Sequence, residues 1–476
     1  MINPRLEGLC SHPINAVVMT FLTHFIIDDV ATTQTDLYKP LICNFLLRHI
    51  DTYLPNVELP KIKDLVDDLP PEVGDPFKKL CLLVYSSSIK NKQLFTANEL
   101  FGHAVVVNDT LGLLSVRPRI TMFGPERYYS FPHLSIQEFL AAVHLSKLSE
   151  SDQTSAIKEV LAKNPLSQVL HFYAGLTNLS NKRALKVLSK ALTQTVGNEA
   201  IMKEMRVTND PRRKALAFFN CLFECQDESL LKLPETDLPV NRHIQQGYDN
   251  LQDAANLLPA VQPFHSLSLH RLALTPIDCI SLGYYIHIKS ITVPTSLIMA
   301  FDFFGCSIDH IGMRVLFTEL KKNVTQRTKV RVQLVLAGNT FDKESLLSLK
   351  ELLQGQSNLE ALGLCKCFDP SVIDLCYALK CLIEGLSNNS SCGFIDLSAN
   401  CFNSSHIYHF ILMLRACPQI YWFDLKAYDL SRVMPLFCKA VVFSALHSLD
   451  ISNCNISDRE LVLLGKRIRI SWLLQK

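Results

Sequence analysis

Residues 359–367, Leu-Glu-Ala-Leu-Gly-Leu-Cys-Lys-Cys, carry the pattern that decides the fold of this chain. Leucines at Leu359, Leu362 and Leu364 are followed by Cys367, which is the spacing LxxLxLxx(N/C). In such a segment alternate strand residues point inward, and the Asn or Cys closes the turn that follows. The pattern therefore predicts a short strand whose leucines face a core.

The same pattern recurs along the C-terminal half of the chain. Leu446, Leu449, Ile451 and Cys454 match it in full, and four partial matches lie upstream of them. The closing Asn, Cys or Tyr falls at 306, 339, 367, 400, 428 and 454, with spacings of 33, 28, 33, 28 and 26 residues. Helical stretches, such as 345–354 and 408–417, separate the strands. One strand and one helix per repeat predict leucine-rich repeats in a horseshoe of the ribonuclease-inhibitor type over residues 263–476.

Alternation along these strands also predicts the concave, partner-binding face of the horseshoe. Asp396, Asp424 and Asp450 take equivalent positions in three strands, which predicts an acidic stripe. Such a stripe favours a basic or polar partner, with Trp422 as the aromatic anchor. The alternative is that the aspartates are ordinary solvated strand positions. The other residues expected on this face are Ala361, Gly363, Lys366, Ser398, Lys426, Ser448 and Ser452.

Length and composition limit the class of protein. A chain of 476 residues has room for two to four domains. Hydrophobic residues make up 48% and charged residues 19%, so the chain can bury sizeable cores and is not mainly disordered. The formal net charge of +2 gives no bulk field for nucleic acid or an anionic membrane.

The N-terminal half is predicted to be mixed α/β and mainly helical. Two extended runs flank residues 123–126, Phe-Gly-Pro-Glu, which predicts a hairpin with its turn there. Ser135 and Glu138 have the spacing of a capping box, so a helix is expected to begin at Ser135. Helices followed by a hairpin and another helix favour a winged-helix unit. Residues 151–262 have an almost wholly helical pattern.

The 16 cysteines favour a reducing, cytosolic setting over a disulfide framework. Many lie inside apolar runs, and none has the paired spacing of a zinc site, so no metal is expected. The apolar stretch 14–27 is too short and too polar to span a bilayer and reads as a helix. No transmembrane segment or export signal is therefore expected.

The sequence lacks the motifs of common enzymes. It has no GxxxxGK[ST] phosphate loop and no GxSxG, HExxH or kinase signature. His133 is the one histidine with a suggestive position, next to an expected helix N-terminus where backbone donors favour anions. The alternative is that His133 only packs or hydrogen-bonds locally, and no catalytic residue is assigned.

Residues 131–142, Phe-Pro-His-Leu-Ser-Ile-Gln-Glu-Phe-Leu-Ala-Ala, resemble the FxHLSxQEFLAA motif of NACHT-containing NOD-like receptors. Residues 9–13 resemble the family's LCxxP segment, and residues 33–49 its TxTxLYxxF stretch. Residues 77–100 and 169–180 are also similar to the family. The resemblance implies four domains: the end of the first helical domain (1–30), a winged-helix domain (31–148), a second helical domain (149–262) and leucine-rich repeats (263–476).

The resemblance also implies two nucleotide contacts. In the family the winged-helix histidine contacts the β-phosphate of ADP and the LCxxP proline lies against the base, which implicates His133 and Pro13. The NTP-binding core that should precede residue 9 is missing from the sequence. No cofactor is therefore expected, with ADP or ATP only if an upstream NACHT core exists. Either the gene model is truncated before or within that core, or the chain is a degenerate paralogue.

The function expected from this reading is that of a non-enzymatic, cytosolic NOD-like-receptor-type protein in innate immune sensing or its regulation. The leucine-rich repeats would bind a protein or ligand, and self-association is a second expectation for partners. The competing hypothesis is a leucine-rich-repeat scaffold or inhibitor without a signalling switch.

Overall fold

The computed structural model of the chain describes residues 4–25, 31–54, 64–103, 111–163, 167–176, 211–226, 264–292, 297–324, 330–355 and 359–465. Short gaps lie inside these ranges, and a few further positions are described between 56 and 62. Contacts between residues divide the chain into two compact units, Met1–Pro239 and Val240–Lys476. Each unit has its own core, and the two are described separately below.

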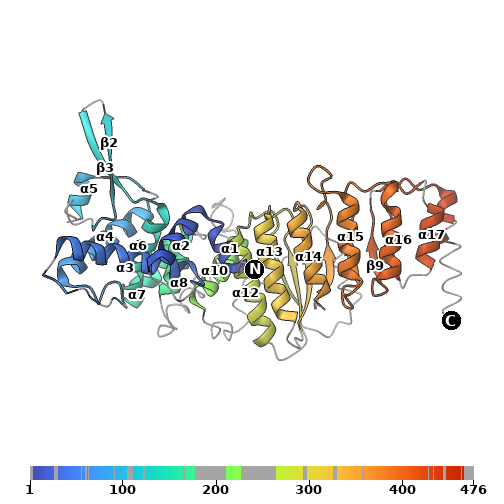
Figure 1. Cartoon of the computed structure of the whole chain (residues 1–476), viewed down its shortest axis with the longest axis horizontal. Coiled ribbons are helices and arrows are strands. Elements are labelled where there is room, and N and C mark those ends of the chain that lie inside the picture. The colour runs from blue at the N-terminus through green and yellow to red at the C-terminus, as the bar shows by residue number, and fades with distance from the viewer. Residues whose placement is uncertain are drawn as a thin grey trace, which may run out of the picture. The chain divides into compact units, whose positions relative to one another are not determined.

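Unit 1 is mainly helical, with one small sheet (Figure 1). Tyr38, Phe139 and Phe172 form the aromatic centre of its core, with ring centroids 5.0 to 6.0 Å apart. All three rings are fully buried, and their contacts pack α3, α6 and α8 against one another. The elements are α1 (Pro4–Cys10), α2 (Pro13–Phe25), α3 (Gln34–Tyr53), α4 (Pro71–Ser88), β1 (Phe95–Thr96), α5 (Ala97–Gly102), β2 (Ser115–Thr121), β3 (Gly124–Ser130), α6 (Leu134–Ser146), α7 (Glu150–Lys163), α8 (Gln168–Leu176) and α10 (Pro211–Cys225).

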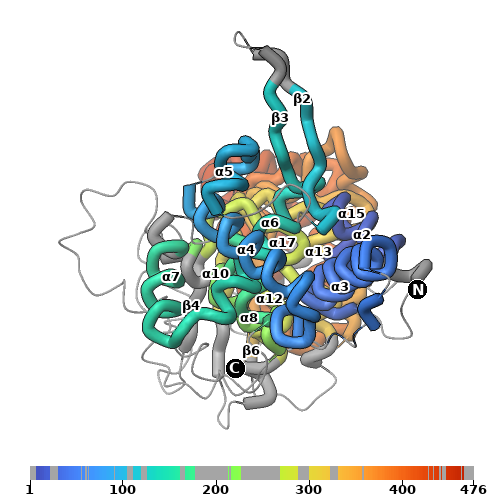
Figure 2. Tube along the Cα trace, turned by 90° about the vertical axis from the view of Figure 1, so that its left-hand side faces the viewer, coloured from blue at the N-terminus to red at the C-terminus, as the bar shows by residue number. Residues whose placement is uncertain are grey.

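The predicted hairpin is present, but its turn was misplaced. Strands β2 and β3 pair antiparallel from Ser115↔Ser130 to Thr121↔Gly124, and the hairpin projects away from the helices of unit 1 (Figure 2). Gly124, Pro125 and Glu126 therefore belong to β3 and not to the turn. Strand β1 pairs with β3 on its other side and completes a three-stranded sheet in the order β1-β3-β2.

The predicted capping box at Ser135 is wrong. Helix α6 begins one residue earlier, at Leu134, and its N-cap is His133 with an extended backbone. The ring Nδ1 of His133 accepts the Ser135 N–H at 3.1 Å. Ser135 thus lies inside the first turn and is buried, and Glu138 is not used as a cap. The physical reason is that the His133 imidazole caps the helix by accepting the free N–H of Ser135, so Ser135 does not take the N-cap position that was expected.

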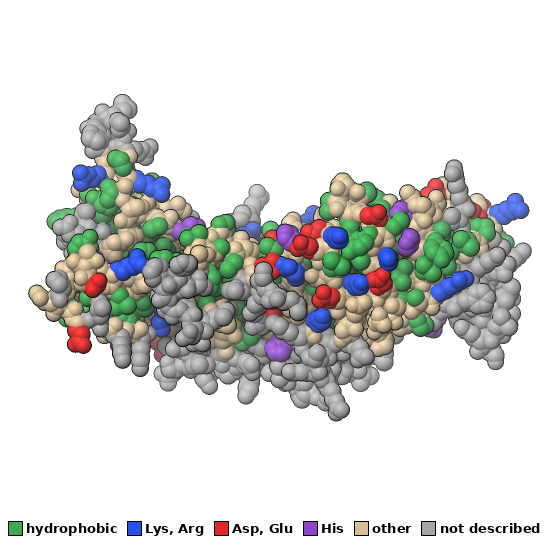
Figure 3. All heavy atoms as spheres, viewed as in Figure 1, with side chains coloured by type: hydrophobic (Ala, Val, Ile, Leu, Met, Phe, Trp, Pro, Cys, Tyr) green, Lys and Arg blue, Asp and Glu red, His purple; other side chains and the backbone are tan. Residues whose placement is uncertain are grey.

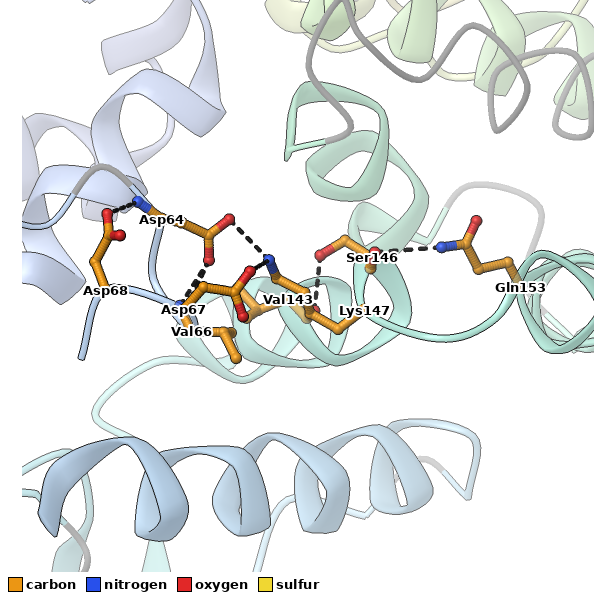
Figure 4. Close-up of polar contacts among 8 residues, drawn as sticks. All are labelled: Asp64, Val66, Asp67, Asp68, Val143, Ser146, Lys147 and Gln153. Carbon is orange, nitrogen blue, oxygen red and sulfur yellow. Dashed lines mark hydrogen bonds and ion pairs between the residues drawn. The ribbon is translucent and has the colours of Figure 1, made fainter. Parts of the chain in front are cut away.

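The C-terminal end of α6 is fixed to the loop that precedes α4. Lys147 Nζ lies 2.8 Å from Asp64 Oδ2 and 2.7 Å from Asp67 Oδ2, between the two carboxylates (Figure 4). Asp64 also accepts the N–H groups of Val66 and Asp67, so the acidic side chain shapes the loop as well as binding the lysine. A cation at the last turn of α6 also complements the negative end of the helix dipole.

A buried carboxylate connects two distant segments of unit 1. Glu224, near the end of α10, accepts the N–H groups of Gln34 and Thr35 at 3.0 Å and the Thr35 hydroxyl at 2.7 Å. These donors lie in the first turn of α3, where free N–H groups and the helix dipole favour a negative charge. Burial raises the pKa of Glu224 to about 7, despite these hydrogen bonds.

Unit 2 is a regular alternation of strands and helices. Its seven strands pair in parallel, in chain order β4-β5-β6-β7-β8-β9-β10, and the connecting helices stand side by side (Figure 1). This is the parallel sheet expected from the repeats. The elements are β4 (Phe264–Ser268), α12 (Pro276–Thr292), β5 (Leu297–Asp302), α13 (His310–Val324), β6 (Val330–Val335), α14 (Lys343–Gln354), β7 (Leu359–Gly363), α15 (Leu375–Leu386), β8 (Phe394–Asp396), the 3₁₀ helix η4 (Ser404–His406), α16 (Ile407–Ala416), β9 (Trp422–Asp424), α17 (Met434–Val442) and β10 (Ser448–Asp450).

The Asn, Cys or Tyr at the end of each pattern closes its repeat onto the preceding one. Asn400 is the fullest case: its Nδ2 donates to Leu364 O at 2.9 Å, and its Oδ1 accepts the N–H groups of Cys367 and Phe368 at 2.8 Å. Every other member donates to the equivalent carbonyl one repeat back. The pairs are Cys306 to Leu269, Asn339 to Phe303, Cys367 to Leu336, Tyr428 to Leu397 and Cys454 to Leu425.

Two further properties concern the chain as a whole. Within the ranges given above, no helix has both the length and the apolar character needed to cross a membrane. All sixteen cysteines are free thiols, and only Cys376 and Cys401 are exposed.

Candidate functional site

The aspartates predicted to form a stripe lie side by side in unit 2. Asp396 is in register with Asp424, and Asp424 with Asp450, so the three carboxylates follow one another across β8, β9 and β10. We call these three residues the aspartate row. The ladder continues through Gly363 and Val335 to Asp302 on β5, which has the same position in its repeat.

Each carboxylate of the aspartate row accepts a hydrogen bond from the backbone two residues further on. Oδ1 of Asp396, Asp424 and Asp450 takes the N–H of Ser398, Lys426 and Ser452 at 2.8 to 2.9 Å. Asp302 does the same with Phe304 at 3.0 Å. An aspartate that accepts its own i+2 N–H forms an Asx turn, which ends the strand. These residues therefore shape the turns of the repeats.

Burial differs along the aspartate row. Asp396 and Asp424 are 6% and 2% exposed, so the alternative of ordinary solvated positions is wrong for both. Burial, with repulsion from Asp396 and Asp450, raises the pKa of Asp424 to about 6. Burial likewise raises the pKa of Asp396. Two of the three carboxylates are thus largely closed to solvent.

Asp450 is the accessible member of the row. It is partly exposed, and its Oδ2 lies 3.1 Å from Lys426 Nζ. Burial acts to raise the pKa of Asp450, but hydrogen bonds from Ser452 and Lys426 outweigh burial and lower it. At this end of the array the Asp450 carboxylate is therefore paired with the Lys426 ammonium, so the surface there is not purely acidic.

Trp422 lies on the same face of the sheet, two residues before Asp424. It is half-buried and packs on Phe394, with ring centroids 5.5 Å apart, beside the buried Ala361. Its indole N–H is buried and has no hydrogen-bond partner among the residues that the structure describes. Ala361, Phe394 and Trp422 are in register and form an apolar row next to the aspartate row.

One residue expected on this face was wrongly assigned, and another was missed. Lys366 has a left-handed backbone (φ 54°) in the turn, and Cys365 takes the position equivalent to Ser398. Counting strictly by twos from Ala361 would have reached Cys365. Asp302 was missed, although the partial match at 298–306 places it where Asp396 stands in its own repeat. Figure 3 shows acidic and basic side chains interspersed over the helices of unit 2.

In unit 1 the structure brings the two predicted nucleotide-contacting segments together. Pro13 begins α2, and its neighbour His12 lies edge-on to His133 with ring centroids 6.0 Å apart. Partial burial and the proximity of His12 lower the pKa of His133. Because Nδ1 of His133 accepts the Ser135 N–H, only Nε2 of this ring is left to meet a ligand.

The pocket at His133 is small. It encloses about 240 Å³ and is lined by His133, Arg117, Gln93, Pro132 and Leu134 among others. Sites for drug-sized ligands usually enclose about 300–1,000 Å³, so this pocket lies below that range. For metals, the described residues contain no group of three His, Cys, Asp or Glu side chains that could hold an ion.

Two comparisons with known proteins bear on this chain. Residues 133–233 match the family described as NLRC4 helical domain HD2, a match that spans α6, α7, α8 and α10. Over 254 residues the chain is 24% identical to the Homo sapiens protein named Protein NLRC5. The aligned region is 50% of this chain and 13% of that protein, so the chain spans only a small part of its length.

Proposed function

Because this chain belongs to the NOD-like receptor family, we propose that it is a non-enzymatic, cytosolic protein of innate immune sensing or its regulation. The face of the unit 2 sheet that carries the apolar and aspartate rows is its partner-binding surface. The observation that carries this proposal is the repeated closure of each strand–helix unit onto the one before it, which aligns the strands in one continuous sheet.

The domain assignments form part of the proposal. Residues 31–148 are a winged-helix domain, and the three-stranded sheet packed with α3, α4 and α6 supports this assignment. Residues 263–476 are leucine-rich repeats of the ribonuclease-inhibitor type, supported by the parallel ladder in chain order and by one helix per strand. The residues between them contain the second helical domain.

The accessible end of the face determines which partner fits. Trp422 supplies an aromatic surface, while Asp450 and Lys426 supply one charge of each sign within 3.1 Å. A partner with an apolar side chain for Trp422 and a polar or basic group for Asp450 would be complementary. The buried Asp396 and Asp424 contribute by shaping the turns and take no direct part in contact.

The experiment compares variants of the full chain as bait in quantitative affinity capture. Trp422→Ala with Asp450→Asn removes the proposed anchor and the accessible charge. Tyr408→Ala is the matched control, because Tyr408 is an aromatic residue that is 61% exposed on α16, away from the strands. Partners lost by the first variant and kept by the second support the proposal. Identical partners for a folded double variant contradict it.

The absence of catalysis is tested separately. We expect isothermal titration calorimetry of the chain with ATP or ADP and magnesium to give no measurable heat of binding, and no phosphate release over hours. The reason is that no phosphate-cradling loop occurs in the sequence. A magnesium-dependent micromolar affinity would overturn the expectation of no nucleotide binding, and phosphate release would overturn the non-enzymatic assignment.

The second candidate is a leucine-rich-repeat scaffold or inhibitor without a switch. The observation that favours it is the Glu224 contact, which fixes α10 to α3 with three hydrogen bonds between segments about 190 residues apart. Hydrogen exchange separates the two candidates. A scaffold would keep its unit 1 protection when a partner binds unit 2, whereas a receptor would change it.

A further inference from the structure

A second pocket of unit 1 has no part in the proposed function. It encloses about 200 Å³ and lies where α4, α6, α7 and the start of α8 meet. Tyr85, Ile89, Leu134, Val160 and Val169 supply its apolar lining. A water molecule occupies about 30 Å³ of liquid, so the pocket has room for about six or seven groups of that size.

Two polar groups in this pocket have no partner. Glu138 lines it and makes no hydrogen bond or ion pair with any residue that the structure describes, although burial raises the pKa of its carboxyl to about 7. Ser88, from α4, also lines it, and its hydroxyl is buried without a hydrogen-bond partner in the described ranges. Buried polar groups are normally satisfied, so the Ser88 hydroxyl, in the same pocket as the half-buried Glu138 carboxyl, is a candidate contact for a ligand.

The charged side chains around the pocket indicate whether its ligand is a cation or an anion. Lys92 also lines the pocket, but its ammonium is paired with Glu99. Gln137 is committed too, because its amide donates to Lys92 O at 2.7 Å. Glu138 is therefore the charge left to be neutralised, and a cation meets that requirement.

We propose that this pocket binds an alkylammonium group, with the ammonium on Glu138 and Ser88 and the alkyl chain along the apolar lining. A chain of about five carbons fills the volume. The group comes either from a free primary amine or from a lysine side chain of a partner protein. The site lies in unit 1 and does not depend on the proposed function of the unit 2 sheet.

The test uses the full chain and two matched probes, n-pentylamine and n-pentanol, in ligand-observed NMR titrations at pH 7.5. The two probes have the same alkyl chain and differ in charge. We expect pentanol to bind at least tenfold more weakly, because its hydroxyl can donate to Glu138 but carries no positive charge to pair with the carboxylate. Equal binding of the two probes would overturn the proposal.

Variants locate the site. Glu138→Gln should weaken pentylamine at least tenfold and leave pentanol unchanged, and Ser88→Ala should weaken pentylamine about threefold. Glu72→Gln, on the exposed surface of α4, is the matched control and should have no effect. If circular dichroism shows that Glu138→Gln does not fold, the Ser88→Ala variant and the comparison of the two probes test the proposal instead. Unchanged affinity in both folded variants refutes the site.

A third probe, Nα-acetyl-lysine N-methylamide, distinguishes the two sources. If it binds within threefold of pentylamine, the pocket accepts a protein lysine. If only pentylamine binds, the ligand is a free amine. If neither binds the wild-type chain at millimolar concentration, the proposal is wrong.

Discussion

At the scale of single residues, the most informative group is the carboxyl of Asp424. It is buried between two other aspartates, yet it is kept because its Oδ1 holds the Lys426 N–H and so ends strand β9. Burying this carboxylate near two other aspartates is electrostatically unfavourable, but the same carboxylate forms the turn that ends β9. Asparagine would make the same turn without the charge, because its side-chain oxygen also accepts an N–H.

Asp424→Asn is therefore expected to stabilise the protein at pH 7.5 by about 1–3 kcal/mol. The pKa of Asp424 is about 6 in the folded state and near 3.8 in the unfolded chain. Between these values the folded state binds more protons, so wild-type stability falls as pH rises from about 4 to 6 and stays low above. The gain from Asn should vanish below pH 4. Urea denaturation at pH 4 and 7.5 measures both.

The control for this prediction is Asp458→Asn, on the solvent-exposed surface of the last repeat, which should change stability little at either pH. A variant at Asp424 that is less stable than wild type at pH 7.5 would show that the ionised carboxylate is stabilising there.

At the scale of secondary-structure elements, the repeats depend on their closing side chains. Asn400 satisfies two buried carbonyls and two buried N–H groups belonging to two adjacent repeats. Asn339, two repeats before Asn400, makes comparable hydrogen bonds. Cys306, Cys367 and Cys454 donate through thiols, which are weaker hydrogen-bond donors. The asparagines are thus the principal polar contacts between repeats.

Asn400→Ala should cost about 2–4 kcal/mol of unfolding free energy, because buried backbone groups lose their partners. Asn388→Ala is the matched control, since Asn388 is exposed and donates only to Glu384 O at 3.2 Å. Equilibrium urea unfolding followed by the fluorescence of the two tryptophans of the chain checks both. Equal stability of the two variants would contradict the role assigned to Asn400.

The elements differ in how fully the sequence predicts them. The repeat pattern predicted strands β5 to β10 and their closing positions correctly, because a repeat tests the same pattern several times over, whereas it did not predict β4. The start of α6 was wrong, because Ser135 and Glu138 have capping-box spacing and only three-dimensional packing shows that His133 caps the helix. The Glu138 pocket was missed for the same reason: that spacing assigns the Glu138 carboxylate to the helix cap, whereas in the structure it lines the pocket between α4, α6, α7 and α8.

At the scale of the whole molecule, the sixteen thiols are distributed through both units, and ten of them are buried. Burial raises the pKa of several of these thiols, such as Cys43 to about 11 and Cys417 to about 12, which suppresses the reactive thiolate. Contacts divide the chain at Pro239, inside the range 149–262 expected for the second helical domain. The domain limits themselves stay predictions.

Native protein at pH 7.5 should therefore react rapidly with about two equivalents of iodoacetamide, at Cys376 and Cys401, and with sixteen after denaturation. Intact-mass spectrometry over a time course measures this, and a Cys376→Ser, Cys401→Ser variant should lose the fast phase. Non-reducing and reducing gels of protein isolated under thiol-blocking conditions should agree. Stoichiometric disulfides would contradict the cytosolic placement.

The bonds that close each repeat onto its predecessor have an evolutionary consequence. Each donor needs only a backbone carbonyl at a fixed place in the previous repeat, and Asn, Cys and Tyr all serve as donors. After one entire repeat is gained or lost, each remaining closing side chain therefore still finds the equivalent carbonyl in the repeat before it. Evolution can therefore lengthen or shorten this chain by whole repeats of 26 to 33 residues without requiring a new kind of contact. Insertion or deletion of part of a repeat would instead leave a backbone carbonyl without its hydrogen-bond donor.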